Sequence, residues 1–442
     1  MTGLLAGAYA GYLLFGSAYQ NLYYDAENYW QLGHRFYQQG RFSLLAYDDA
    51  LRGYAYPLVN FACLAVRKAL DWRAVTVVKL LNAALAGGLF GLIGPRLWQV
   101  TLGQPTPPSA VRRLLWAALG FVFWGEYFNF SLSDFPALAA LGLALWQGQR
   151  PTWGAALLAG LALALAINVR PIYQIAVPPA VLLLLLHSGS AWKPRLGLFA
   201  LGAALVLTPQ WLINRQQFGA NTPLVLAQSQ ELHIQNLYLQ KLKWGLLHQK
   251  YESSVGGELP TGQLLFLDPA GAALLRQEGL ANFSTAGQYL RVVARHPGTV
   301  AGAYGRHLFA GLDISHPTPY LRRWAPSGLR QGLNYTCWFW AALVLVGLGR
   351  PTRRPGLVLG ALLLPCLAVL PLSMEVRFLL PLHLLLLALV AFGPRPSWAV
   401  KKARLLVLAV AYGLFMLGCF ALSAHITRAV EPRFQAYLLP AS

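Results

Sequence analysis

The sequence predicts an all-α polytopic membrane protein with about eleven transmembrane helices. Hydrophobic residues make up 56% and charged residues 11% of the 442 residues, and the mean hydropathy is +0.47. One soluble core could not bury so much apolar surface. A membrane-spanning helix needs about 20 mostly apolar residues. Segments of roughly that kind lie at 2 to 19, 74 to 95, 114 to 130, 134 to 147, 153 to 169, 171 to 187, 196 to 213, 335 to 349, 356 to 372, 376 to 392 and 403 to 422.

The connecting loops predict the orientation. Positive residues are retained on the cytoplasmic side of a membrane. With the N-terminus inside, the cytoplasmic loops hold no acidic residue and thirteen basic ones: Arg96, Arg112, Arg113, Arg150, Lys193, Arg195, Arg350, Arg353, Arg354, Arg395, Lys401, Lys402 and Arg404. Topology and attraction to anionic lipids account for the net charge of +20, so nucleic acid is not an expected partner.

The first apolar segment is expected to remain as a helix. It lacks a basic start and an A-x-A cleavage site, so it does not have the pattern of a signal peptide. The four cysteines are scattered and no pair has zinc-site spacing, which favours a packing role.

Two outer connections, residues 20–73 and 214–334, are too long for simple loops. They divide the chain into an N-terminal transmembrane module (1–213), a large outer region (214–334) and a C-terminal transmembrane module (335–442). In the first connection, ENYWQLGHRF predicts an interfacial helix that Gly40 would end. Residues 56–71 form a second amphipathic stretch.

Two further expectations concern the second connection. Residues 231–251 mix apolar side chains with lysines and predict an amphipathic surface helix. The segment ESSVGGELPTG, residues 252–262, predicts a flexible loop.

Carboxylates at the outer helix ends are the best indication of chemistry. Asp25 and Glu27 lie in YYDAENYW, just after the first apolar segment, although a solvated loop would also explain them. Asp48 and Asp49 fit plain loop acids better.

Other ionisable residues lie at the outer ends of later segments. Glu126 and Asp134 flank a short turn, Arg170 follows in NVRPIYQ, and Glu375 and Arg377 lie in SMEVRFLLPLH. Such groups near a membrane usually face a cavity or one another. Asp134 could instead cap a helix, and Glu375 with Arg377 could be a structural ion pair.

These motifs, in their order, resemble the GT-C superfamily of polytopic glycosyltransferases, with the bacterial protein O-mannosyltransferase and aminoarabinose-transferase types nearest in pattern. The resemblance rests on YYDAENYWQLG, Tyr56-Pro57, SDFPALAALGLAL, NVRPIY and EVRFLLPLH, and it covers residues 1 to about 420. It implies a multi-pass enzyme of the bacterial cytoplasmic membrane with its active site facing the exterior.

The resemblance also implies a reaction. The donor would be a sugar on a polyprenyl phosphate, and a hydroxyl acceptor on a lipid, glycan or protein would attack with inversion. Asp25, with Glu27 as the alternative, would act as general base. Four cations would bind the donor phosphate: Arg170, Arg377, Lys241 and Lys243.

Some GT-C relatives use a divalent cation, which Asp134 and Glu126 could bind here, but a DxD motif is lacking. Glu375 and Tyr56 would support the site. Two other classes stay open: a flippase or transporter of a lipid-linked or anionic solute, and a non-catalytic subunit that binds a partner through residues 214–334.

Overall fold

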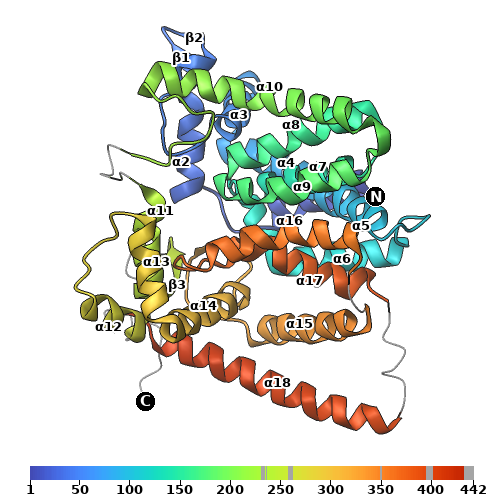
Figure 1. The fold of residues 1–442 in the computed structure, drawn as a ribbon, viewed down its shortest axis with the longest axis vertical. Coiled ribbons are helices and arrows are strands. Elements are labelled where there is room, and N and C mark those ends of the chain that lie inside the picture. Colours follow the sequence, from blue (N-terminus) through green and yellow to red (C-terminus); the bar gives the residue numbers. More distant parts are fainter. Residues whose placement is uncertain (230–233, 235, 257–261, 349–350, 395–401, 433–442) are drawn as a thin grey trace. The chain divides into compact units, whose positions relative to one another are not determined.

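The protein is mostly helical and its contacts divide it into two units (Figure 1). The structure, a computed structural model, describes the chain except residues 230–233, 235, 257–261, 349–350, 395–401 and 433–442. Unit 1 comprises Met1–Ala117, Gly125–Gln235 and Pro351–Pro365, and unit 2 comprises Ala118–Trp124, Asn236–Arg350 and Cys366–Ser442. Arg350, Arg395 and Lys401, which were assigned to cytoplasmic loops, lie outside the described residues.

Unit 1 begins with α1 (Thr2–Gly11) and its π-helical continuation η1 (Tyr12–Gly16). The first outer connection then forms α2 (Tyr24–Leu32), η2 (Gly33–Phe36), β1 (Tyr37–Gln38), β2 (Arg41–Phe42), η3 (Leu44–Ala46) and α3 (Ala55–Leu70). A long apolar helix follows as α4 (Ala74–Gly88), η4 (Leu89–Ile93) and α5 (Gly94–Thr101).

The rest of unit 1 is also helical. It contains η5 (Gly125–Asn129), α7 (Asp134–Gly148), α8 (Trp153–Val169), η6 (Pro171–Ala176), α9 (Val177–Leu186), η7 (Gly189–Ala191) and α10 (Trp192–Phe218). Two helices, α6 (Ala110–Trp124) and α16 (Arg353–Val369), have residues in both units.

Helix α8 lies between α7 and α10 and packs closely on α10 (Figure 1). Glycine makes this approach possible, because a Cβ on Gly160 would lie 1.9 Å from the Phe199 carbonyl oxygen and one on Gly202 would lie 2.0 Å from that of Leu157. Small residues let apolar helices bring their backbones together in this way.

Helices α1 and α4 run antiparallel. A Cβ on Gly87 would meet Thr2 and Ala6 near the start of α1, whereas Lys79, earlier in α4, donates to the Tyr19 carbonyl oxygen beyond the end of η1 at 2.8 Å. The end of the first apolar segment and the beginning of α4 therefore lie at the same end of this helix pair.

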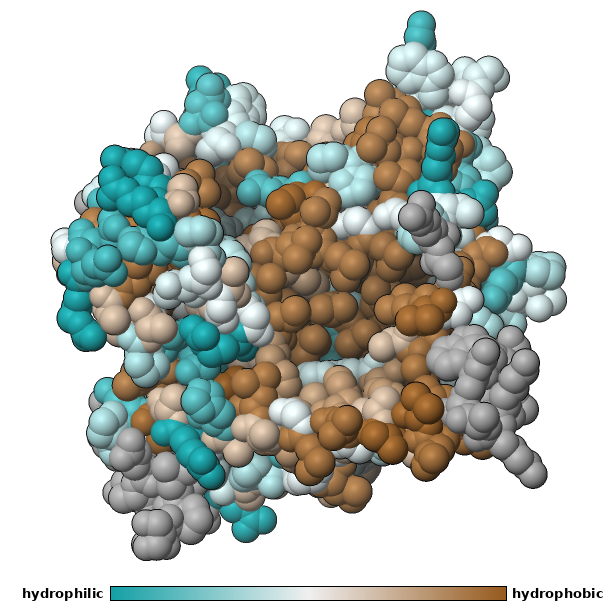
Figure 2. Space-filling model, turned by 60° about the horizontal axis from the view of Figure 1, so that its bottom comes forward, coloured by the Kyte–Doolittle hydropathy of each residue, from teal (hydrophilic) through white to brown (hydrophobic). Residues whose placement is uncertain are grey.

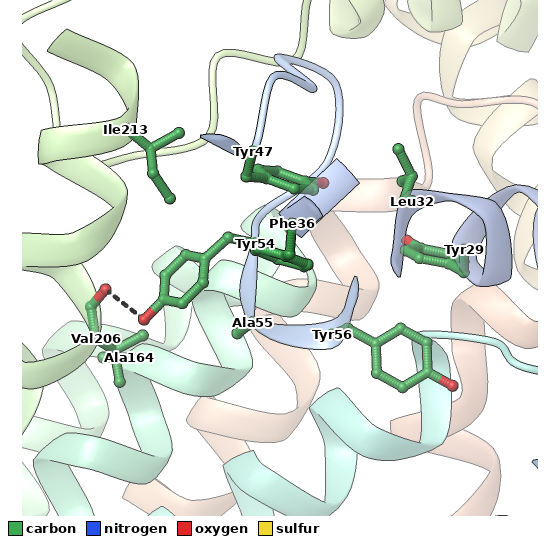
Figure 3. Close-up of a cluster of buried hydrophobic side chains, with 10 residues drawn as sticks. All are labelled: Tyr29, Leu32, Phe36, Tyr47, Tyr54, Ala55, Tyr56, Ala164, Val206 and Ile213. Atoms are coloured by element: carbon green, nitrogen blue, oxygen red, sulfur yellow. Dashed lines mark hydrogen bonds between the residues drawn. The ribbon is translucent and has the colours of Figure 1, made fainter. Parts of the chain in front are cut away.

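The first outer connection folds onto α8 and α10. Figure 3 shows Tyr29, Leu32, Phe36, Tyr47, Tyr54, Ala55 and Tyr56 packed with Ala164 of α8 and with Val206 and Ile213 of α10. The Tyr54 hydroxyl donates to the Val206 carbonyl oxygen at 3.2 Å. The connection is thus part of the core of unit 1.

Unit 2 contains a small sheet among helices. Its elements are α11 (Leu237–Leu247), β3 (His248–Ser254), β4 (Gly262–Leu267), α12 (Pro269–Gln277), α13 (Ala286–Arg295), α14 (Pro297–Leu312), β5 (Tyr320–Leu321), α15 (Gly328–Leu348), η8 (Val376–Leu379), α17 (Leu380–Phe392) and α18 (Lys402–Arg428). Strand β3 pairs antiparallel with β4 and parallel with β5, with Tyr251 opposite Leu265.

Buried polar contacts hold the helices of unit 2 together. Asp313, at the end of α14, accepts from Tyr335 of α15 at 2.7 Å and from Ser423 of α18 at 2.6 Å. His383 of α17 accepts from Trp124 Nε1 at 3.0 Å and donates to Asn334 of α15 at 2.9 Å. Buried polar groups are stable only when paired in this way.

The mostly helical structure is compatible with the expected all-α class, to which β1–β2 and β4–β3–β5 add two small sheets. Two other expectations need correction. Of the helix predicted at 231–251, residues 231–233 and 235 lie outside the described part, and the helix found is Leu237–Leu247. His248, Lys250 and Tyr251 pair with β4 instead. Residues 252–254 of the predicted loop also belong to β3, and residues 257–261 lie outside the described part.

Gly40 does not end the first interfacial helix. That helix ends at Phe36, and Gln39 and Gly40 form the turn between β1 and β2 with φ angles of 50° and 78°. A two-residue hairpin turn of this type requires positive φ at both positions, which glycine adopts at little cost.

Each of the eleven predicted apolar segments contains helix. Among the described residues, three helices are long and apolar enough to cross a membrane: Ala74–Thr101, Gly189–Phe218 and Leu405–Arg428. Four shorter apolar helices accompany them: Thr2–Gly16, Trp153–Val169, Pro171–Leu186 and Val376–Phe392.

Figure 2 shows apolar residues over much of the surface in view, and Leu406, Val407 and Leu417 of α18 are each more than 65% exposed. Lipid is the environment in which such a surface is stable.

All four cysteines are buried and none forms a disulfide: Cys63, Cys337, Cys366 and Cys419. They sit among apolar side chains, as the sequence led us to expect of packing residues.

The α8–α10 contact yields a test. We expect Gly160→Ala to lower the free energy of unfolding by about 1–3 kcal/mol, because the added methyl group overpacks the helix contact. Gly154→Ala in the same helix is the matched control, since its Cβ would meet no described atom within 4 Å. Thermal unfolding of the purified proteins measures the stability of each variant. Equal stability of Gly160→Ala and Gly154→Ala would contradict this packing.

Candidate functional site

Asp25 lies in the first turn of α2 and is held by Arg52. Arg52 Nη2 lies 3.1 Å from Asp25 Oδ1, and the two side chains are 29% and 31% exposed. The Arg52 guanidinium also lies over the Tyr29 ring, 5.1 Å from its centroid. The carboxylate is therefore oriented by a cation while still reaching solvent, and it sits favourably at a helix N-terminus.

The backbone around Arg52 is fixed by Asp49 and Tyr47. Asp49 Oδ1 accepts from the backbone N–H of Leu51 at 2.9 Å and of Arg52 at 2.6 Å. Burial raises the pKa of Asp49, and the backbone hydrogen bonds oppose that shift. The Tyr47 hydroxyl donates to the Arg52 carbonyl oxygen at 3.2 Å. Asp49 thus positions the partner of Asp25, whereas Asp48 forms an exposed ion pair with Arg35 at 3.2 Å.

A buried amide network attaches this segment to α8 and α10. Asn168 Oδ1 accepts from the Ala55 N–H at 2.9 Å, and Asn168 Nδ2 donates to Gln210 Oε1 at 2.8 Å. Gln210 Oε1 also accepts from the Tyr54 N–H at 3.2 Å. A Cβ on Gly53 would lie 2.1 Å from the Asn168 carbonyl oxygen, so only glycine allows this approach. Residues 52–55 are therefore fixed against the end of α8.

Arg170 caps that same end of α8 and forms an ion pair with Asp134, the first residue of α7. Asp134 is 1% exposed and Arg170 is 20% exposed. The cap position before α7 is Ser133, and the Asp134 carboxylate binds Arg170 across the two helices. Asp134 thus holds a cation that remains partly accessible.

Tyr56 is buried in the same core cluster as Tyr29. Its ring packs edge-on against Tyr29 with centroids 5.2 Å apart (Figure 3), and its hydroxyl lies 3.2 Å from Ser131 Oγ. Ser131 in turn donates to Asn60 at 2.8 Å. Tyr56 therefore supports Tyr29, which lies under Arg52.

Glu27 has surroundings different from those of Asp25. It accepts a hydrogen bond from Gln31 one turn later in α2, and it lines a pocket with Trp30 and Arg73. The two acids thus occupy separate positions on the first outer connection.

Glu126 and Asp134 are held by donors from different segments. It accepts from Tyr12, from Ser17 at 2.9 Å and from Asn129 at 2.6 Å, while Asp134 is neutralised by Arg170. In the described part of the chain, no three His, Cys, Asp or Glu side chains come together to hold a metal ion. The divalent cation that Asp134 and Glu126 could bind therefore stays an expectation.

In unit 2, Glu375 and Arg377 form an ion pair at the start of the tenth apolar segment. Arg377 Nε lies 2.6 Å from Glu375 Oε2, and both side chains are about a tenth exposed. Lys241 Nζ lies over the ring of neighbouring Phe378, 5.4 Å from its centroid, whereas Lys243 donates to Asn282 at 3.0 Å. Lys241 therefore lies with the Arg377 segment and Lys243 lies apart from it.

Unit 2 also holds a buried charged pair outside the predicted site. Lys250 Nζ lies 3.3 Å from Glu252 Oε1 and over the Phe266 ring, 4.8 Å from its centroid. Burial raises the pKa of Glu252, and Lys250 lowers it. Both charged residues belong to β3, and the contact of Lys250 with Phe266 connects that strand to β4.

Sequence reasoning missed Arg52, Asn168 and Gln210. Arg52 stands in a connection with several charges, and no spacing links it to Asp25. Asn168 offered a signal, since it is an amide in the otherwise apolar helix α8 and a polar group there needs a buried partner. Gln210 offered a weaker one, because it ends the apolar run of α10 and further polar residues follow it.

Comparison of the chain with protein-family models, curated proteins and solved structures finds no match. The resemblance to GT-C glycosyltransferases therefore stays an expectation. The arrangement of Asp25, Arg52, Asp134 and Arg170 in unit 1 is the basis on which function is proposed below.

The amide network predicts a loss of stability on substitution. We expect Asn168→Ala to lower the free energy of unfolding by about 1–3 kcal/mol, because it leaves the buried Ala55 N–H without its acceptor. Asn221→Ala is the control, since Asn221 makes an exposed hydrogen bond to Trp211. If thermal unfolding gave the two variants equal stability, the network would not hold the segment.

Proposed function

We propose that the chain is an inverting glycosyltransferase with about eleven membrane-spanning helices. It transfers a sugar from a polyprenyl-phosphate donor to a hydroxyl acceptor at the outer face of the cytoplasmic membrane. Asp25 is its general base, and Arg170 binds the donor phosphate.

One observation carries the proposal. Asp25 is a partly exposed carboxylate held by Arg52, and Arg170 is a partly exposed guanidinium held by Asp134. Asn168 joins the segment that contains Arg52 to the end of α8, where Arg170 lies. Glycosyl transfer from a phosphate needs both: a base for the acceptor proton and a cation for the leaving group.

The reaction balances with these two groups. Asp25 takes the proton of the acceptor hydroxyl as its oxygen forms a bond to the anomeric carbon. The bond between that carbon and the phosphate oxygen breaks on the opposite face, and the phosphate leaves with the electron pair. Arg170 stabilises the added negative charge through paired N–H donors.

The counter-ions support these roles. Arg52 forms an ion pair with the Asp25 carboxylate and orients it, while the Arg52 guanidinium itself lies over the Tyr29 ring. Asp134 fixes the Arg170 guanidinium, which remains 20% exposed. A preorganised pair needs little rearrangement when the substrate binds.

Arg377 and Lys241 are the further phosphate-binding residues that we propose in unit 2, since Lys241 of α11 lies over Phe378, which follows Arg377. Lys243 is the weaker choice because it donates to Asn282. Glu27 is the alternative base. A divalent cation held by Asp134 and Glu126 stays an expectation.

The membrane suits this reaction. A polyprenyl chain stays in the bilayer while its phosphate lies at the surface, and the apolar helices of the chain fit such surroundings. The absence of acidic residues from the assigned cytoplasmic loops favours an outer position for Asp25.

The test compares two acids of the same connection. We expect Asp25→Asn to reduce sugar transfer from a panel of polyprenyl-phosphate sugars by about 100-fold or more, because the base is lost. Asp48→Asn is the matched control, since Asp48 also pairs with an arginine but lies outside the site, and it should retain activity. The Asp25 variant should still bind the donor.

Other outcomes would point elsewhere. Full activity of Asp25→Asn with loss in Glu27→Gln would move the base to Glu27. A flippase or transporter would be favoured if the monodisperse wild type turned over no donor but moved a lipid-linked solute across the membrane of vesicles.

A further inference from the structure

Unit 1 contains a pocket of about 280 Å³ beside the end of the first apolar segment. Its polar wall comes from Gln20, Asn21, Glu27, Arg67 and Arg73, and Trp30 contributes apolar surface. The volume lies below that of a pocket for a drug-sized molecule. It suits a small polar group.

The pocket lies at the end of an antiparallel pair of apolar helices. Gln20 follows η1, and Arg73 directly precedes α4, which begins one of the three long apolar helices. Because the two helices run in opposite directions, these residues lie at the same end of the pair. In a membrane this end lies at the level of the lipid head groups.

The arginines provide a site for a phosphate. Arg67 lies in the last turn of α3 and Arg73 lies just before α4, so both reach the pocket from neighbouring helix ends. Arg73 Nη2 donates to the Gln20 carbonyl oxygen at 3.0 Å, which fixes its guanidinium at the wall. A guanidinium has five N–H donors and binds phosphate oxygens in pairs.

Glu27 gives the pocket a negative charge as well. Its carboxylate lies in the same pocket as the two arginines and accepts from Gln31, which orients it. A purely anionic ligand would be attracted by the arginines and repelled by this acid. A ligand that carries a phosphate and an ammonium group matches all three charges.

We propose that this pocket binds the head group of a zwitterionic aminophospholipid, of the phosphoethanolamine class. Arg67 and Arg73 bind the phosphodiester and Glu27 accepts from the ammonium group. Leu22 and Trp30 provide the apolar side, against which the glycerol end of the lipid lies. The site is distinct from Asp25 and Arg170, and it does not depend on the proposed enzymatic activity.

The test measures lipid binding to the full-length chain in detergent by native mass spectrometry. We expect the wild type to prefer phosphatidylethanolamine to phosphatidylglycerol, and Arg67→Gln with Arg73→Gln to weaken binding by about tenfold or more, because charge-assisted hydrogen bonds are lost. Lys68→Gln is the matched control, since Lys68 is an exposed cation beside Arg67 that does not line the pocket.

Glu27→Gln separates the head-group proposal from simple attraction of anions. We expect this variant to bind the two lipids equally, because the ammonium group loses its acceptor. Soluble phosphoethanolamine should displace the lipid only weakly, since it lacks the glycerol and acyl part.

Three results would overturn the proposal. They are a preference of the wild type for phosphatidylglycerol, equal loss in the Lys68 control and the double arginine variant, or binding of soluble phosphoethanolamine as tight as that of the lipid. Thermal unfolding of each variant, compared with that of wild type, ensures that only folded protein is scored.

Discussion

The hydrogen bonds of Asn168 are the constraint on which the rest of unit 1 depends. This one amide joins the backbone before α3 to α8 and, through Gln210, to α10. In an apolar surrounding an unpaired amide is costly, so the three segments are held in one arrangement. The aromatic residues in Figure 3 fill the space that this arrangement creates. The first outer connection thereby becomes part of the packed core of unit 1.

Two kinds of close approach make that attachment possible. Glycines at 160 and 202 allow α8 and α10 to touch, and Gly53 allows the connection to pass over the end of α8. The positions of the ionic groups depend on these contacts, because Arg52 and Arg170 lie on the segments that the contacts hold in place. Packing therefore sets the placement of the charges, and the charges need only orient one another across short distances.

Hydropathy located helix in each of the eleven apolar segments, but it did not indicate α12, α13 and α14 of the second outer connection. The sheet β4–β3–β5 escaped prediction, since residues 248–254 mix charged and apolar side chains and become a strand only by pairing with the distant β4 and β5. Asp134 and Arg170 were both chosen from sequence, but their pairing depends on how α7 meets α8. Arg52 was missed because its partner lies 27 residues away and nothing local marks the link.

The burial of all four thiols has a practical consequence for studying this chain. A thiol-reactive dye that cannot cross a bilayer should leave the native protein nearly unmodified, because buried and protonated sulfhydryls react slowly. Single cysteines introduced at exposed positions would then report which compartment each loop faces, without removal of the natural ones. Membrane sidedness can thus be mapped on a chain whose interior is unaltered.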